Sequence, residues 1–208
     1  MARSTRLRQL EKRLTELRRH LLPADLSPTG SYSPRVIDRA RAYRLLVHAE
    51  VEACIEDIVR DLASNEYKAW ELDRTPRPCL LAMVSFYGTK FPEIPEVVPA
   101  ALSSVTPGFM KDRVQTARNA YMRVIATNHG VKEKHLLRLL LPIGVQENQL
   151  DRTWLATMDS FGSGRGDVAH QSFRTQQPPD PATELATVAQ IVTGLRQVDA
   201  LIGQLRGA

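Results

Sequence analysis

The sequence contains few cysteines, few aromatic residues and no long apolar run. It has two cysteines, Cys54 and Cys79, and aromatic residues make up 6% of its 208 residues. The two cysteines do not have the spacing of metal ligands, and such sparse use of cysteine is typical of a reducing compartment. No segment approaches the roughly 20 apolar residues of a membrane span, and the first residues lack the apolar region of a signal peptide. We therefore expect a cytoplasmic protein with no membrane segment.

The composition excludes a disordered chain. Hydrophobic residues make up 43% and charged residues 25% of the sequence, which is close to the average of soluble globular proteins. Disordered chains contain fewer apolar residues. The length suits one domain that can bury a core without disulfide bonds or metal ions. We therefore treat residues 1–208 as a single domain.

The formal net charge of +5 has one source. Residues 1–22 contain seven basic and two acidic residues, and the rest of the chain is balanced. The chain has 22 arginines and 6 lysines. Arginine forms forked contacts with phosphate that lysine cannot form, although codon usage explains such a preference equally well. The basic segment either guides a polyanion or only solvates the surface.

Leucines recur every three or four residues in the N-terminal segment, a spacing that predicts a helix with a narrow apolar seam. The helix is expected to end before Pro23 because proline cannot continue it. The seam either packs on the rest of the domain or pairs with a second chain. Its members are Leu7, Leu10, Leu14, Leu17 and Leu21.

A long helix is predicted over residues 34–65, with Ser33 as its N-cap and Pro34 in its first turn. His48 and Glu52 are four residues apart beside its apolar face, so their side chains are expected to be neighbours on the surface. Six prolines between residues 73 and 108 predict a long connection with one short helix near Leu80–Tyr87. A connection of this length in a compact domain is often functional.

Helices are predicted again over residues 109–173 and 181–205. Asn128, His129 and Gly130 are expected to end one of them, and Pro142 ends a short leucine-rich helix over residues 132–141. A further helix runs to Phe161 and places Trp154 in the core, after which the glycines of residues 162–166 predict a hinge. No stretch alternates like a strand. The predicted fold is all-α, an antiparallel helical bundle with one long proline-rich connection.

The residues with the clearest chemistry are Arg165 and His170. Cleavage of RNA by its own 2′-hydroxyl group requires a base, an acid and a cation that stabilises the crowded phosphate. Histidine titrates near neutral pH and can be the base or the acid, and arginine donates forked hydrogen bonds to phosphate oxygens. Residues five apart on a helix differ by about 140° and about 7.5 Å in rise. The glycines before Arg165 predict a helix start there, whose free N–H groups would favour phosphate.

Spacing by itself does not select this pair. When four to six intervening residues are allowed, three further pairs match, namely Arg13 with His20, Arg41 with His48, and Arg123 with His129. The pair could also be a surface arginine and an ordinary helix histidine. The surrounding sequence has to decide between them.

The surrounding sequence resembles HEPN domains of the RiboL-PSP branch. Residues 128–132 (NHGVK), the leucine-rich helix up to residues 141–144 (LPIG), residues 159–162 (DSFG) and residues 165–170 (RGDVAH) match the C-terminal part of that family in order. Residues 43–62, which include HAEVE, resemble its long early helix.

The resemblance implies an all-α domain that forms homodimers in which two Arg-x4–6-His boxes meet. Many members are metal-independent endoribonucleases of toxin–antitoxin, antiviral defence or RNA-processing systems. Arg165 would then stabilise phosphate charge and His170 would transfer protons, with no cofactor and with an antitoxin or operon-linked protein as a further partner. Many members have a polar residue directly after the arginine, where this chain has Gly166, and Asp167 follows one residue later.

Three functions follow from these observations. The first is an endoribonuclease with Arg165 and His170 as catalytic residues, supported by Asp167, His48 and Glu52. The second is a non-catalytic HEPN module that binds RNA or a partner protein. The third is a helical interaction protein that uses its N-terminal leucine seam to bind a partner.

Overall fold

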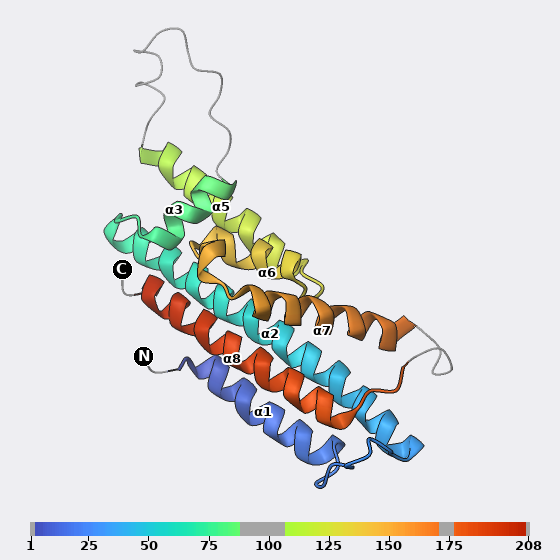
Figure 1. Ribbon diagram of the computed structural model, residues 1–208. Coiled ribbons are helices and arrows are strands. Elements are labelled where there is room, and N and C mark those ends of the chain that lie inside the picture. Colours follow the sequence, from blue (N-terminus) through green and yellow to red (C-terminus); the bar gives the residue numbers. More distant parts are fainter. Residues whose placement is uncertain (1–2, 88–106, 171–176, 207–208) are drawn as a thin grey trace.

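The computed structural model describes residues 3–87, 107–170 and 177–206, except for the side chains of residues 107–109 and 165–170. Every regular element in these ranges is a helix, so the all-α class is confirmed (Figure 1). The α-helices are α1 (Thr5–Leu21), α2 (Pro34–Asp73), α3 (Pro78–Tyr87), α5 (Pro107–Ala126), α6 (Glu133–Leu140), α7 (Arg152–His170) and α8 (Pro181–Arg206), and two 3₁₀ turns cover Leu141–Ile143 and Glu147–Gln149.

Helix α2 is the central element, and its 40 residues make it about 60 Å long. Helices α1, α7 and α8 run alongside it in Figure 1. Helices α1 and α7 run antiparallel to α2, as the sequence predicted. Helix α8 runs parallel to α2 in Figure 1. In agreement with this direction, Glu184 near the start of α8 bonds Arg44 near the start of α2.

The leucine seam of α1 packs inside this chain. Ser4 caps the helix by accepting a hydrogen bond from the backbone N–H of Leu7. The seam residues Leu7, Leu10, Leu14 and Leu17 are all at least 94% buried, facing α2 and α8. The seam is therefore not available to a second chain, and the hypothesis of a seam that pairs with a partner is wrong.

Helix α2 begins as predicted, with Ser33 as N-cap and Pro34 as the first helical residue. It is longer than predicted and ends at Asp73 instead of residue 65. Arg74 stops it in the left-handed conformation, with a φ of 58°. The apolar pattern weakens after Leu62, but Tyr67 and Trp70 continue the buried face.

The proline-rich connection contains a helix where one was expected. Helix α3 covers Pro78–Tyr87, whereas the predicted helix was Leu80–Tyr87. It starts earlier because proline is favourable in the first helical turn. Residues 88–106 of the connection lie outside the described part of the chain. Helix α5 resumes at Pro107, and Gly130, with a φ of 148°, lies in the turn that follows it.

Both cysteine thiols are buried in the core. Burial raises the pKa of Cys54 to about 12, and it raises the pKa of Cys79 to about 12 as well. Because the thiolate is the reactive form, both side chains are inert at neutral pH. Neither cysteine is a catalytic candidate.

Helix α8 is apolar enough, by length and hydropathy, to span a membrane, so the expectation that no segment approaches such a span is wrong. Its buried residues, among them Ile191, Leu195 and Ile202, pack against the neighbouring helices. Core packing therefore accounts for its composition.

Helices α7 and α8 pack closely where Trp154 covers Gly194. The indole Nε1 donates a hydrogen bond to the carbonyl oxygen of Ile191 at 3.2 Å. A Cβ atom added to Gly194 would lie 2.1 Å from Cδ1 of Trp154. Only glycine permits this contact.

We predict that Gly194→Ala lowers the free energy of unfolding by about 2 kcal/mol, because the overpacking penalty exceeds the gain in helix propensity. Urea denaturation followed by far-UV circular dichroism measures the change. The control is the exposed neighbour Thr193→Ala, which should shift stability by less than about 0.5 kcal/mol. Wild-type stability of Gly194→Ala would contradict the packing described.

Candidate functional site

The Arg165–His170 box lies in the last turns of α7. The helix is continuous from Arg152 to His170, so the predicted hinge at residues 162–166 and the predicted helix start at Arg165 are both wrong. Free N–H groups of a helix start therefore cannot bind phosphate there. The backbone of Arg165, Asp167 and His170 is helical, while their side chains lie outside the described part of the structure.

The glycines before the box allow close packing of α7 and do not break the helix. A Cβ atom on Gly162 would lie 2.8 Å from Cγ of Lys132, and one on Gly164 would lie 2.9 Å from Nη1 of Arg44. Both distances are too short for a real Cβ contact. Glycine at these positions lets α7 approach the α5–α6 loop and α2 without interrupting the helix.

Arg44 and Glu184 form an ion pair beside Gly164. The Nε atom of Arg44 donates to Oε2 of Glu184 at 3.0 Å, and Nη2 donates to Oε1. The Glu184 side chain is 3% exposed and that of Arg44 is 25% exposed. This forked pair joins α2 to the first turn of α8 at the level where the box begins.

His48 lies beneath α7, one helical turn from Arg44. Its ring stacks on Phe161 with 5.8 Å between the ring centroids, and its Nδ1 atom is 3.5 Å from Oε2 of Glu52. The predicted pairing of His48 with Glu52 is therefore confirmed. The predicted surface position of His48 is wrong, since it is 2% exposed. The ring is covered in the folded chain, and its contact with Phe161 helps to position α7 against α2.

Arg41 belongs to the same stripe of α2. Arg41 is seven residues before His48, so the two positions are separated by only about 20° around the helix axis. Its side chain is 15% exposed, and Nη1 is 2.8 Å from Oδ1 of Asp38. The stripe that faces α7 thus carries Arg41, His48 and Glu52, with Arg44 at its flank. The sequence gives no signal for the Arg44–Glu184 pair, because the two residues are 140 positions apart in the chain.

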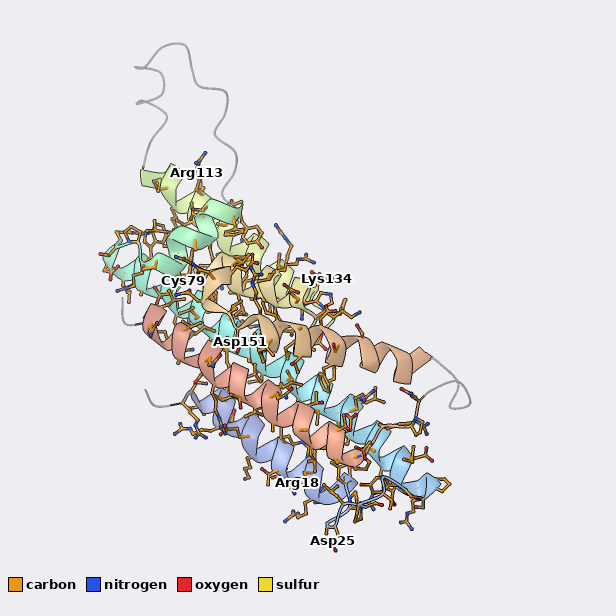
Figure 2. All side chains as sticks on the ribbon, in the orientation of Figure 1. Arg18, Asp25, Cys79, Arg113, Lys134 and Asp151 are labelled. Atoms are coloured by element: carbon orange, nitrogen blue, oxygen red, sulfur yellow. The ribbon has the colours of Figure 1, made fainter. Side chains whose placement is uncertain are left out.

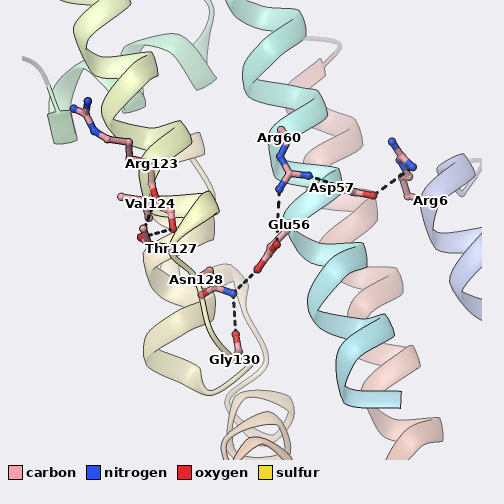
Figure 3. Close-up of polar contacts among 9 residues, drawn as sticks. All are labelled: Arg6, Glu56, Asp57, Arg60, Arg123, Val124, Thr127, Asn128 and Gly130. Atoms are coloured by element: carbon pink, nitrogen blue, oxygen red, sulfur yellow. Dashed lines mark hydrogen bonds and ion pairs between the residues drawn. The ribbon is translucent and has the colours of Figure 1, made fainter. Parts of the chain in front are cut away.

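Asn128 anchors the loop against which α7 packs. Its Nδ2 atom donates to Oε1 of Glu56 at 2.9 Å and to the carbonyl oxygen of Gly130 at 3.0 Å (Figure 3). These bonds hold the turn that leads to Lys132, which contacts Gly162. His129, by contrast, is exposed. The Asn128–Gly130 segment therefore supports α7 and contributes no described side chain to the box.

Comparison with known proteins gives one family. The family model described as RiboL-PSP-HEPN matches residues 8–193. Neither curated proteins nor solved structures gave a match.

We predict that Arg44→Met lowers the free energy of unfolding by about 3 kcal/mol, because it leaves the buried Glu184 carboxylate without its partner. Chemical denaturation measures the loss. Adding Glu184→Gln should restore part of it, since the unpaired buried charge is then removed.

The matched control is Arg60→Met on the same helix. The Arg60 side chain is 42% exposed, so solvent screens its pairs with Glu56 and Asp57 and this change should cost less than about 1 kcal/mol. Equal losses for Arg44→Met and Arg60→Met would mean that the Arg44–Glu184 pair does not hold the bundle together.

Proposed function

We propose that this chain, which belongs to the RiboL-PSP-HEPN family, is a metal-independent endoribonuclease. Family membership supports a nuclease or RNA-binding module in general. The observation that favours catalysis is the placement of the Arg-x4-His box on one continuous helix, held against α2 by Gly164 and Phe161. A supported helix keeps Arg165 and His170 at fixed relative positions, which catalysis requires.

The proposed reaction uses the 2′-hydroxyl group of the substrate as nucleophile. Its oxygen bonds to the neighbouring phosphorus, its proton passes to a base, and the bond from phosphorus to the 5′-oxygen breaks as that oxygen takes a proton from an acid. The products are a 2′,3′-cyclic phosphate and a 5′-hydroxyl end. His170 is the base or the acid, and Arg165 stabilises the charge on the phosphate oxygens. Asp167 lies between them in sequence and would orient one of the two.

A homodimer supplies what a single box lacks. Positions five apart on a helix, such as 165 and 170, are separated by about 140° around its axis, and the reaction needs both a base and an acid. Two boxes that meet across a two-fold axis provide two histidines and two arginines. We propose that the protein acts in this form in the cytoplasm, in a defence, toxin or RNA-processing system, with an antitoxin or operon-linked protein as a further partner.

His170→Ala and Arg165→Ala should each lower RNA cleavage by at least about 100-fold, the usual contribution of a general acid or base. Cleavage of mixed RNA that includes tRNA measures the effect, and helicity and dimerisation should be unchanged. Arg123→Ala and His129→Ala are the matched controls, because they form another pair of similar spacing and both are exposed. Wild-type cleavage by His170→Ala would refute the assignment.

Cleavage should continue in EDTA, and the new 3′ ends should carry a 2′,3′-cyclic phosphate, because the nucleophile is the 2′-hydroxyl group itself. Substrates with 2′-O-methyl groups should bind but not be cut. Inhibition by EDTA, or products with a 5′-phosphate, would indicate different chemistry.

The alternative is a non-catalytic HEPN module that binds RNA or a partner protein. It is favoured by Gly166, which occupies the place where many family members have a polar residue after the arginine. Binding of RNA without turnover in the same assay would select this alternative.

A further inference from the structure

The charge of α2 changes sign along its length. Residues 34–44 carry four arginines and one aspartate, whereas residues 45–73 carry eight acidic and two basic residues. One end of the central helix is therefore basic and the rest strongly acidic.

Helix α1 neutralises the acidic part of α2. Arg6 lies 3.3 Å from both Asp57 and Asp61, and Arg13 lies 3.0 Å from Glu50. These contacts explain part of the basic character of the N-terminal segment without any ligand. The arginines of α1 that pair with α2 balance charge inside the fold.

The last turn of α1 lies beyond this acidic part. The Nη2 atom of Arg39 donates a hydrogen bond to the carbonyl oxygen of His20, which places the end of α1 beside the arginine-rich start of α2. Arg18 lines a pocket together with Tyr43 and Leu185, so it lies near the start of α8. Arg18 is labelled at this end of the bundle in Figure 2.

Three arginines at this end are exposed, namely Arg18, Arg19 and Arg35. Among the described residues, none of the three forms an ion pair with a carboxylate, and Arg19 contacts only the ring of His20. Three positive charges therefore meet solvent where α2 is itself basic. We name Arg18, Arg19 and Arg35 the basic end.

The basic end is the end at which the box lies. The last turns of α7 point to the same end of the bundle as the last turn of α1 and the first turns of α2 and α8 (Figure 1). Arg44, which touches Gly164, is only five residues from Arg39, a rise of about 7.5 Å. Since α1 and α7 both pack on α2 at about 8–10 Å between axes, they lie within about 20 Å of each other.

We propose that the basic end binds the phosphate backbone of single-stranded RNA and guides it to the Arg165–His170 box. This inference rests on the proposed function and adds where the substrate enters. Exposed arginines without carboxylate partners are free to form forked contacts with phosphates. Such contacts release counterions and fix position without reading sequence, so the surface suits RNA of any base composition.

The test compares two double variants of α1 that lose the same charge. Arg18→Gln/Arg19→Gln changes the basic end. Arg8→Gln/Lys12→Gln removes two exposed bases from the other half of the helix, and none of these four residues pairs with a described carboxylate. The probe is a single-stranded 2′-O-methyl RNA oligonucleotide, which lacks the nucleophile, so binding is measured separately from cleavage.

The Arg18/Arg19 variant should flatten the dependence of log K on log salt by about 1.4, because each lost contact with a single strand contributes about 0.7. Over the decade from 1 M to 0.1 M salt this corresponds to about 25-fold weaker binding at 0.1 M. Arg35→Gln should flatten it by a further ~0.7. The Arg8/Lys12 variant should keep the wild-type slope, and Arg18→Lys/Arg19→Lys should recover most of the affinity.

Equal slopes for the two double variants, or no RNA binding by the wild type, would overturn the proposal. Unchanged RNA binding together with loss of binding to polyglutamate would also overturn it, since the surface would then dock an acidic protein. Thermal melts must show that every variant is folded at the assay temperature. A change in binding is then not caused by unfolding. Because the probe cannot be cut, this result is independent of whether His170→Ala abolishes cleavage.

Discussion

The close approach of α7 to α2 is the contact on which the rest of the candidate site depends. It is possible because Gly164 has no side chain where Arg44 of α2 lies against the helix, and Gly162 likewise makes room for Lys132 of the α5–α6 loop. The stacking of Phe161 on His48 adds an aromatic contact at the same crossing. Any side chain larger than hydrogen at Gly164 would have to displace a guanidinium group that Glu184 holds by two hydrogen bonds. The box therefore extends from a helix whose base is fixed by steric fit.

Burial changes the role that fits His48. On the sequence it is one of several histidines near an arginine, and it forms an Arg-x6-His pair with Arg41. In the structure it is covered, paired with Glu52 and stacked on an aromatic ring. These contacts suit a positioning residue, whereas proton transfer to a substrate requires access. His170 is the histidine for which the family resemblance and the helix placement agree.

The charge pattern has two physical parts. Along most of its length, α1 supplies bases that pair with the acids of α2, so its charge is a property of the fold. At its last turn α1 lies beside the arginine-rich start of α2, and Arg18 and Arg19 have no carboxylate partner in the described structure. A net charge of +5 assigned to the N-terminal segment as a whole hides this division. The position of each charge relative to its neighbours decides whether it can bind a ligand.

Local sequence determined much of the fold. Leucine periodicity predicted α1, the Ser33–Pro34 start predicted the beginning of α2, and prolines predicted the interruptions around α3, because caps and apolar stripes act between residues close in the chain. The resemblance of the box to a family was also visible in the sequence, and the family match agrees with it. Local sequence failed at residues 162–166, where glycines suggested a hinge and the structure shows a continuous helix. The reason is tertiary, since those glycines make room for Lys132 and Arg44, which lie far away in the chain. The burial of His48, the Arg44–Glu184 pair and the separation of paired from unpaired arginines likewise depend on which helices meet, and only the packed structure brings those partners together.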